Sequence, residues 1–154
     1  GAGFPSWQLE PSSGMSVDSL VADALAWHDT LPAGAVPLFT SSVGPEELAR
    51  IRQEYDGVPV AEIFEQALAG IAAGLRERGI DRFVVAGGET SGAVTSGLGV
   101  SGGVMGGSVD EGVAWLYSAQ EPSVALLLKS GNFGDPELFL RATDPARAWG
   151  VRND

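Results

Sequence analysis

The sequence predicts a layered α/β domain whose mixed, partly parallel β-sheet is flanked by helices. Short apolar segments alternate with helical patterns over residues 16–98, which is typical of strands joined by crossover helices. Two further apolar segments, residues 113–117 and 124–128, follow each other with no helix between them. Part of the sheet should therefore be antiparallel. The 154 residues suit a single domain with a core over residues 7–143 and a polar tail over 144–154.

The N-terminal segment should contain two strands around one helix. Residues 7–11 are expected to form an edge strand or an arm. Ser16 is a suitable cap for a helix that runs to about Leu31, because apolar residues follow it at helical spacing. Beyond a proline and glycine turn, residues 35–40 are predicted to form a buried strand.

Two helices should follow. Pro45 fits the first position of a helix that ends near residues 55–57, and acidic residues occupy its first turn. The next helix has the strongest pattern in the chain, with an acidic face that we expect to be solvated and Gly79 as its C-terminal stop. Its apolar residues are Val60, Ile63, Phe64, Ala67, Leu68, Ile71, Ala72 and Leu75, and its acids are Glu62, Glu65 and Glu77.

The C-terminal half begins with a predicted strand over residues 82–86, a glycine loop and a short helix to about Leu98. The glycine-rich segment 100–109 should include another strand. A last helix is expected to start at Asp135 and Pro136 and to run through about Ala142.

Composition excludes several classes of function. A net charge of −11 argues against nucleic acid and anionic membranes as partners. Cysteine is absent, so disulfides and thiolate metal sites are excluded. No apolar stretch is long enough to span a bilayer, and we expect a cytoplasmic protein. An acidic protein still binds nucleotides when Mg²⁺ and a few local cations offset the repulsion.

The glycine loop has the composition of a phosphate site. It comprises Gly87, Gly88, Glu89, Thr90, Ser91 and Gly92, between a predicted strand and a predicted helix. Glycine lets the backbone approach a ligand closely, and a helix start offers free N–H groups to an anion. An acid beside a phosphate is repulsive unless it holds a metal, a water or a loop amide, so Glu89 is a candidate Mg²⁺ ligand. Without a ligand, the same segment would be a tight strand-to-helix turn.

A second glycine turn strengthens the prediction of a nucleotide site. It contains Lys129, Ser130, Gly131 and Asn132 and also follows an apolar strand. Open α/β sheets bind ligands at the carboxyl ends of their strands, where Lys129 would be a point charge for phosphate.

Other motifs carry less weight. The glycine positions that a P-loop requires upstream of Lys129 are occupied by Leu128 and Ser123. Residues 97–102 match G-x-G-x-x-G but follow a helix, so the match is accidental. His28, the only histidine, falls on the apolar face of its helix and is predicted to be structural. Asp110 is either part of a solvated turn or a carboxylate that binds Mg²⁺ or shapes the nucleotide pocket, and both alternatives stand.

The two loops resemble those of the four-carbon acid sugar kinases. The similarity lies in residues 85–94, 98–100 and 127–134, with the helix around 66–75 also matching, and it extends over about residues 9–142. The family has an N-terminal domain that binds the sugar acid and a C-terminal domain that binds ATP. This chain is similar to the C-terminal domain alone. It departs from the family in residues 111–115, where two prolines are replaced.

The resemblance implies ATP contacts at Gly87, Gly88, Glu89, Thr90 and Gly131. It also implies Mg-ATP as the nucleotide, and a kinase that phosphorylates threonate, erythronate or a 3-oxo-tetronate. The resemblance further implies that the substrate domain is absent from this chain. The catalytic base and the acceptor contacts should come mostly from that domain, so we expect the isolated domain to be inactive. Its exposed partner surface should also favour a homodimer.

Two other functions remain open at this point. The chain could be a non-catalytic nucleotide-binding or interaction module. It could also be a hydrolase acting through Ser91 or Ser130, although a single, poorly placed histidine disfavours this.

Overall fold

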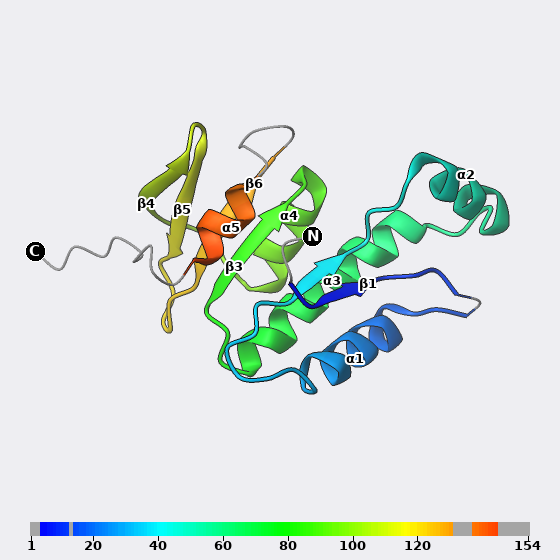
Figure 1. Cartoon of the computed structure of the whole chain (residues 1–154), viewed down its shortest axis with the longest axis horizontal. Helices are drawn as coiled ribbons and strands as arrows, with labels where there is room; N and C mark the ends of the chain where they lie inside the picture. Colours follow the sequence, from blue (N-terminus) through cyan, green and yellow to red (C-terminus); the bar gives the residue numbers. More distant parts are fainter. Residues whose placement is uncertain (1–3, 13, 131–136, 145–154) are drawn as a thin grey trace, which may run out of the picture.

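The computed structural model describes residues 4–12, 14–130 and 137–144, and Figure 1 shows how its elements are arranged. In chain order they are β1 (Ser6–Gln8), α1 (Val17–His28), β2 (Leu38–Thr40), α2 (Pro45–Glu54), α3 (Val60–Glu77), β3 (Arg82–Ala86), α4 (Gly88–Gly97), β4 (Gly103–Asp110), β5 (Val113–Ser118), β6 (Ala125–Lys129) and α5 (Leu138–Thr143).

The main sheet is mixed, as the sequence predicts. Its strand order is β3-β6-β5-β4, with β3 and β6 parallel and the other two pairs antiparallel. Because β4 and β6 are both antiparallel to β5, the strands β3, β6 and β4 all run in one direction. Their carboxyl ends therefore lie at one edge of the sheet.

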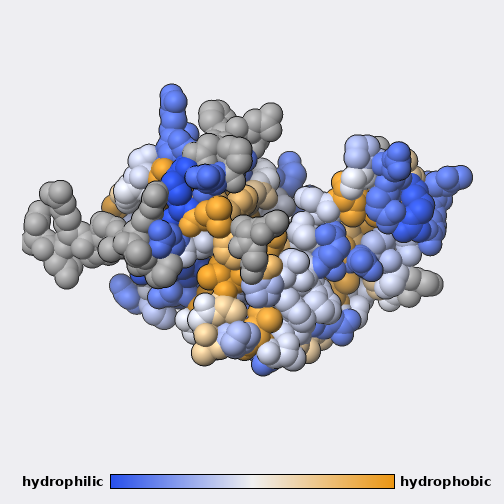
Figure 2. Space-filling model, viewed as in Figure 1, coloured by the Kyte–Doolittle hydropathy of each residue, from blue (hydrophilic) through white to orange (hydrophobic). Residues whose placement is uncertain are grey.

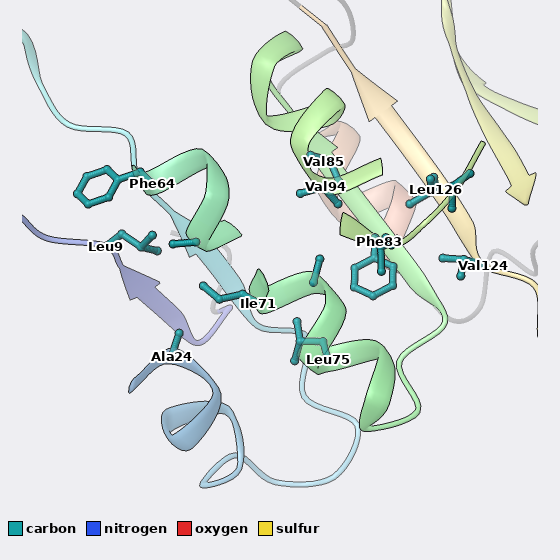
Figure 3. Close-up of a cluster of buried hydrophobic side chains, with 14 residues drawn as sticks. Leu9, Ala24, Phe64, Ile71, Leu75, Phe83, Val85, Val94, Val124 and Leu126 are labelled. Atoms are coloured by element: carbon teal, nitrogen blue, oxygen red, sulfur yellow. The ribbon is translucent and has the colours of Figure 1, made fainter. Parts of the chain in front are cut away.

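The alternation of side chains divides the sheet into two apolar faces. One face contributes Phe83, Val85 and Leu126 to a cluster with α3 and α4. Figure 3 shows these side chains between the sheet and the helices. The other face contributes Trp115 and Leu127 to a second cluster, which α5 covers through Leu138 and Ala142. Helices thus cover both faces of the sheet.

Close helix packing places α3 at the centre of the first cluster. A Cβ at Gly70 would meet Val21 of α1, and one at Gly97 of α4 would lie 2.9 Å from the Ala69 carbonyl oxygen of α3. These glycines let α1 and α4 approach α3 on two sides. The predicted apolar face of α3 is confirmed, since Phe64, Ala67, Ile71, Ala72 and Leu75 are buried.

The N-terminal strands differ from their prediction. β1 pairs in parallel with β2 in a separate two-stranded sheet. The predicted buried strand over residues 35–40 is shortened to Leu38–Thr40, and Leu38 is 43% exposed. The prediction was wrong because only one face of this small sheet packs on the core, through Phe39. Likewise α1 ends at His28 rather than near Leu31, with Asp29 as its C-cap.

The glycine segment also differs. Residues 88–92, which the sequence assigned to a loop, form the first turns of α4, and only Gly87 remains outside the helix. The predicted helix start at Asp135 and Pro136, and most of the tail over 144–154, lie outside the described residues. None of the described helices is long and apolar enough to cross a membrane.

Candidate nucleotide site

Gly87 is the junction between β3 and α4. Its φ of 107° is a conformation that L side chains rarely adopt, which explains a glycine at this position. Its N–H donates to the carbonyl oxygen of Lys129 at 2.9 Å, one residue beyond the pairing of Ala86 with Lys129. The two predicted loops therefore start side by side at the carboxyl edge of the sheet.

The start of α4 presents three backbone donors. The N–H of Ser91 makes the first bond of the helix, to the Gly87 carbonyl oxygen at 2.9 Å. The N–H groups of Gly88, Glu89 and Thr90 precede that bond and have no partner within the helix. Gly87 provides no side-chain cap, and a Cβ on Gly88 or Gly92 would meet open space. A phosphate can therefore approach these donors at the positive end of the helix.

Ser91 lies behind this surface rather than on it. Only 9% of it is exposed, and its Oγ has no hydrogen-bond partner among the described residues. Because its own N–H is used inside the helix, the amides available to a phosphate are the three that precede it. Ser91 is buried, and His28 lies on α1, which packs chiefly on α3. Both observations disfavour Ser91 as a nucleophile.

The second loop is described only in part. Lys129 is the last residue of β6, and strand alternation places it on the same face as Leu127, the face under α5. Its side chain therefore projects from the face opposite α4, although its backbone adjoins Gly87. Ser130 is exposed. Gly131 and Asn132 lie outside the described residues.

The two candidate metal ligands stand on different parts of the same edge. Glu89 is exposed in the first turn of α4. Asp110 ends β4, three strands from β3, which corresponds to about 14 Å across the sheet. It accepts hydrogen bonds from Arg141 Nη2 at 2.9 Å and from the N–H of Glu111 at 2.8 Å. Within the described part of the chain, no three His, Asp or Glu side chains gather as a metal site.

A cavity of about 500 Å³ adjoins the start of α4. Thr90 lines it together with residues of α2, the start of α3 and the segments before each. Glu65, expected on the solvated face of its helix, is half-buried and lines this cavity. Sequence reasoning missed the cavity, although the apolar Val58 and Val60 around Pro59, between two helices, were a signal for it.

A bidentate ion pair between two helices lies away from this site. Arg78, just after α3, donates to both carboxylate oxygens of Asp29 at 2.7 and 2.9 Å. The Arg78 guanidinium, with a smaller effect from His28, lowers the pKa of the Asp29 carboxyl to about 2. His28 is half-buried with Nδ1 3.3 Å from Asp29 Oδ1, so it belongs to this structural pair, as expected. The pair joins the C-terminal ends of α1 and α3.

A sequence model of a known family, described as a nucleotide-binding C-terminal domain, matches residues 8–139. The chain belongs to this family. The nucleotide-binding domain is 45% identical over 144 residues to a 3-oxo-tetronate kinase of Methylobacterium radiotolerans, covering 92% of this chain and 34% of the kinase. It is 42% identical over 122 residues to a 3-oxo-tetronate kinase of Salmonella typhimurium, and the match covers 79% of this chain and 29% of the kinase. The predicted membership of the four-carbon acid sugar kinase family is confirmed.

Solved structures share the fold of this domain. A protein from Salmonella typhimurium LT2, described as a tRNA synthase, has a TM-score of 0.80 at 36% identity. A protein from Haemophilus influenzae has a TM-score of 0.76 at 31% identity. Each match covers 90% of this nucleotide-binding domain and 34% of the solved chain. The domain thus spans about a third of the length of the relatives it matches.

Proposed function

We propose that this nucleotide-binding domain holds Mg-ATP for a kinase that phosphorylates a hydroxyl of a four-carbon sugar acid. The observation that carries the proposal is the open start of α4, where the N–H groups of Gly88, Glu89 and Thr90 have no partner within the helix. The names of the two kinases compared above favour a 3-oxo-tetronate as the acceptor. Threonate and erythronate are the other four-carbon acids to test.

The residues at this site suit a magnesium nucleotide. The three N–H groups would bind phosphate oxygens, and Gly88 leaves room for a close approach. Mg²⁺ prefers one or two carboxylates together with the phosphates themselves, and Glu89 is an exposed carboxylate at this point. The bound ion would offset the charge of the phosphates, which an acidic chain requires. Lys129, Ser130, Gly131 and Asn132 remain predicted contacts, and Asp110 a predicted metal ligand.

The acceptor and the base that activates it would belong to the part of the kinase outside these residues. The isolated domain should therefore bind nucleotide and show no turnover, whereas the complete gene product should phosphorylate a four-carbon acid. If the complete gene product bound ATP but phosphorylated none of the three acids, a non-catalytic nucleotide-binding module would be the better description.

The test of the nucleotide site is Gly88→Asp. A Cβ at Gly88 meets open space, so the variant should fold, but its carboxylate would stand among the phosphate donors. We expect calorimetry with Mg-ADP to show affinity reduced at least about tenfold, which corresponds to about 1.4 kcal/mol.

Gly102→Asp is the matched control. It adds the same charge at an exposed glycine with open space, just before β4 and at the opposite edge of the sheet. The control should leave the affinity within about twofold. Equal loss in both variants, or no loss in Gly88→Asp, would contradict a nucleotide at the start of α4.

A further inference from the structure

We infer that the cavity between α2 and α3 is the nucleoside pocket of this domain, and that it receives the base and ribose of the nucleotide. The inference rests on the proposed function, because it assigns the other end of the same ligand. The cavity measures about 500 Å³, within the range of about 300–1,000 Å³ that is typical of small-molecule sites.

The walls of this nucleoside pocket suit a flat, mostly apolar group. Aliphatic and aromatic side chains line it, namely Val43, Leu48, Ile51 and Val58 together with the rings of Tyr55 and Phe64. Leu48 and Val58 are 40% and 43% exposed, so apolar surface remains uncovered at the mouth of the cavity. A stacked or inserted base would remove that surface from water.

The position of Thr90 connects this pocket to the phosphate donors. Thr90 is the third residue of α4 and carries the last of the three open N–H groups, and it also lines the cavity. One extended ligand can therefore reach from the open N–H groups of α4 into the cavity. Its anionic end would meet the start of α4, and its neutral end would enter the cavity. In Figure 2, the lobe at the right, which α2 forms in Figure 1, is mostly hydrophilic, with smaller apolar areas beside it.

The charges at the cavity select the neutral end of the ligand. Asp56 and Glu65 line it, and none of the described lining residues is a lysine or an arginine. A sugar acid or a phosphate would meet two carboxylates with no cation there. A nucleoside brings hydrogen-bond donors instead, namely its ribose hydroxyls and an exocyclic amino group, and carboxylates accept from such donors. The same wall therefore favours a nucleoside and disfavours the acceptor acid.

Photolabelling gives a direct test. The complete gene product is irradiated with Mg-8-azido-ATP, whose azide is on the base, and then digested with trypsin. The sequence separates the two ends of the ligand, because cleavage after Arg52 and Arg76 releases residues 53–76, which hold most of the pocket. Residues 83–129, including the start of α4, form another peptide. We expect the label in 53–76, and unlabelled ATP should abolish it. Label confined to 83–129, or to segments outside 1–154, would overturn the inference.

A substitution separates this inference from the proposed function. Ala61 is an exposed residue of α3 that lines the cavity, so Ala61→Trp would fill the pocket without entering the core. We expect Mg-ADP affinity to fall at least about tenfold while inorganic tripolyphosphate, which has no base, binds within about twofold of the parent. Ala49→Trp, at an exposed residue of α2 that does not line the cavity, should leave both ligands unaffected.

The combined outcomes are distinguishable. If Gly88→Asp weakens Mg-ADP binding and Ala61→Trp does not, the phosphates are at α4 but the base lies elsewhere, and only this inference fails. If neither variant weakens Mg-ADP binding, both the proposed function and this inference fail. An equal loss of affinity for tripolyphosphate and for Mg-ADP in Ala61→Trp would also overturn the inference of a nucleoside pocket, because the effect would then not depend on the base.

Discussion

Gly87 and Ser16 show how one residue at a helix start determines what that start can bind. Ser16 caps α1 with its side chain, which accepts from the N–H of Ser19 at 3.1 Å. Gly87 has no side chain to do this, so the corresponding donors of α4 stay open. A capped helix start stabilises the fold, whereas an uncapped one at a sheet edge is available to an anion. The absence of a cap is thus the residue-scale feature behind the proposed phosphate site.

Asp29 provides a pH-dependent prediction at the same scale. Its pKa of about 2 lies below the value of about 3.9 in an unfolded chain. The ion pair with Arg78 therefore stabilises the fold above about pH 4, and this contribution is lost as the pH falls through 2. We expect Asp29→Asn to lower the urea midpoint slightly at pH 7. The difference from the parent should shrink between pH 4 and 2.

Asp23→Asn removes the same charge from an exposed position of α1 and serves as the control for this series. Its effect on the urea midpoint should be smaller at pH 7. A difference between Asp29→Asn and the parent that stayed constant down to pH 2 would show that the ion pair is not its cause.

At the scale of elements, glycine decides how closely α4 approaches α3. A Cβ at Gly97 would lie 2.9 Å from the Ala69 carbonyl oxygen, a backbone atom that cannot rotate away. At Gly92, in the same helix, a Cβ would meet nothing within 4 Å. The two positions share a helix and a residue type and differ in what faces them. They are therefore a matched pair for measuring the value of this helix contact.

We expect Gly97→Ala to destabilise the fold by about 1–3 kcal/mol, because α4 must shift away from α3. Gly92→Ala should instead be neutral or stabilising by up to about 1 kcal/mol, since alanine is the better helix former and has room. Urea denaturation followed by far-UV circular dichroism measures both. Similar effects at the two positions would contradict close packing of α3 and α4 at Ala69.

At the scale of the whole molecule, β6 connects the two apolar clusters. Leu126 faces the cluster with α3 and α4, and Leu127 faces the cluster with α5; both are fully buried. Neighbouring residues of β6 therefore pack into opposite clusters. If β6 left the sheet, both clusters would be disrupted together. This supports the expectation of a single cooperative domain, which remains a prediction.

Leu126→Ala and Leu127→Ala test that expectation. Each should cost about 2–5 kcal/mol, the usual range for removing a buried leucine side chain. In both variants, unfolding followed by tryptophan fluorescence and by far-UV circular dichroism should give one coincident transition. Two separated transitions in either variant would show that the clusters unfold independently.

Another whole-molecule feature is the outer strand β4. Val104 and Met105 are 70% and 66% exposed on this edge of the sheet. The expected homodimer remains a prediction.

Much of the fold could be predicted from local sequence. The helix α3 and the strands β3 and β5 begin and end within a residue or two of the bounds that the sequence predicts. These elements are dictated by hydrophobic spacing, glycine and proline, which act within a few residues. β2 was mispredicted because burial of a strand depends on what covers it, and Leu38 stays 43% exposed on one face of the small sheet.

The sequence by itself determined the mixed sheet, the family resemblance and the glycine segment at the end of β3. Only the tertiary structure decided that the Gly87 N–H bonds to Lys129, that Lys129 lies on the face opposite α4, and that Asp110 pairs with Arg141. It also brought Thr90 to the cavity formed by residues 41–65. The reason is physical: these contacts depend on strand pairing and helix packing between segments far apart in the chain, which local spacing does not encode.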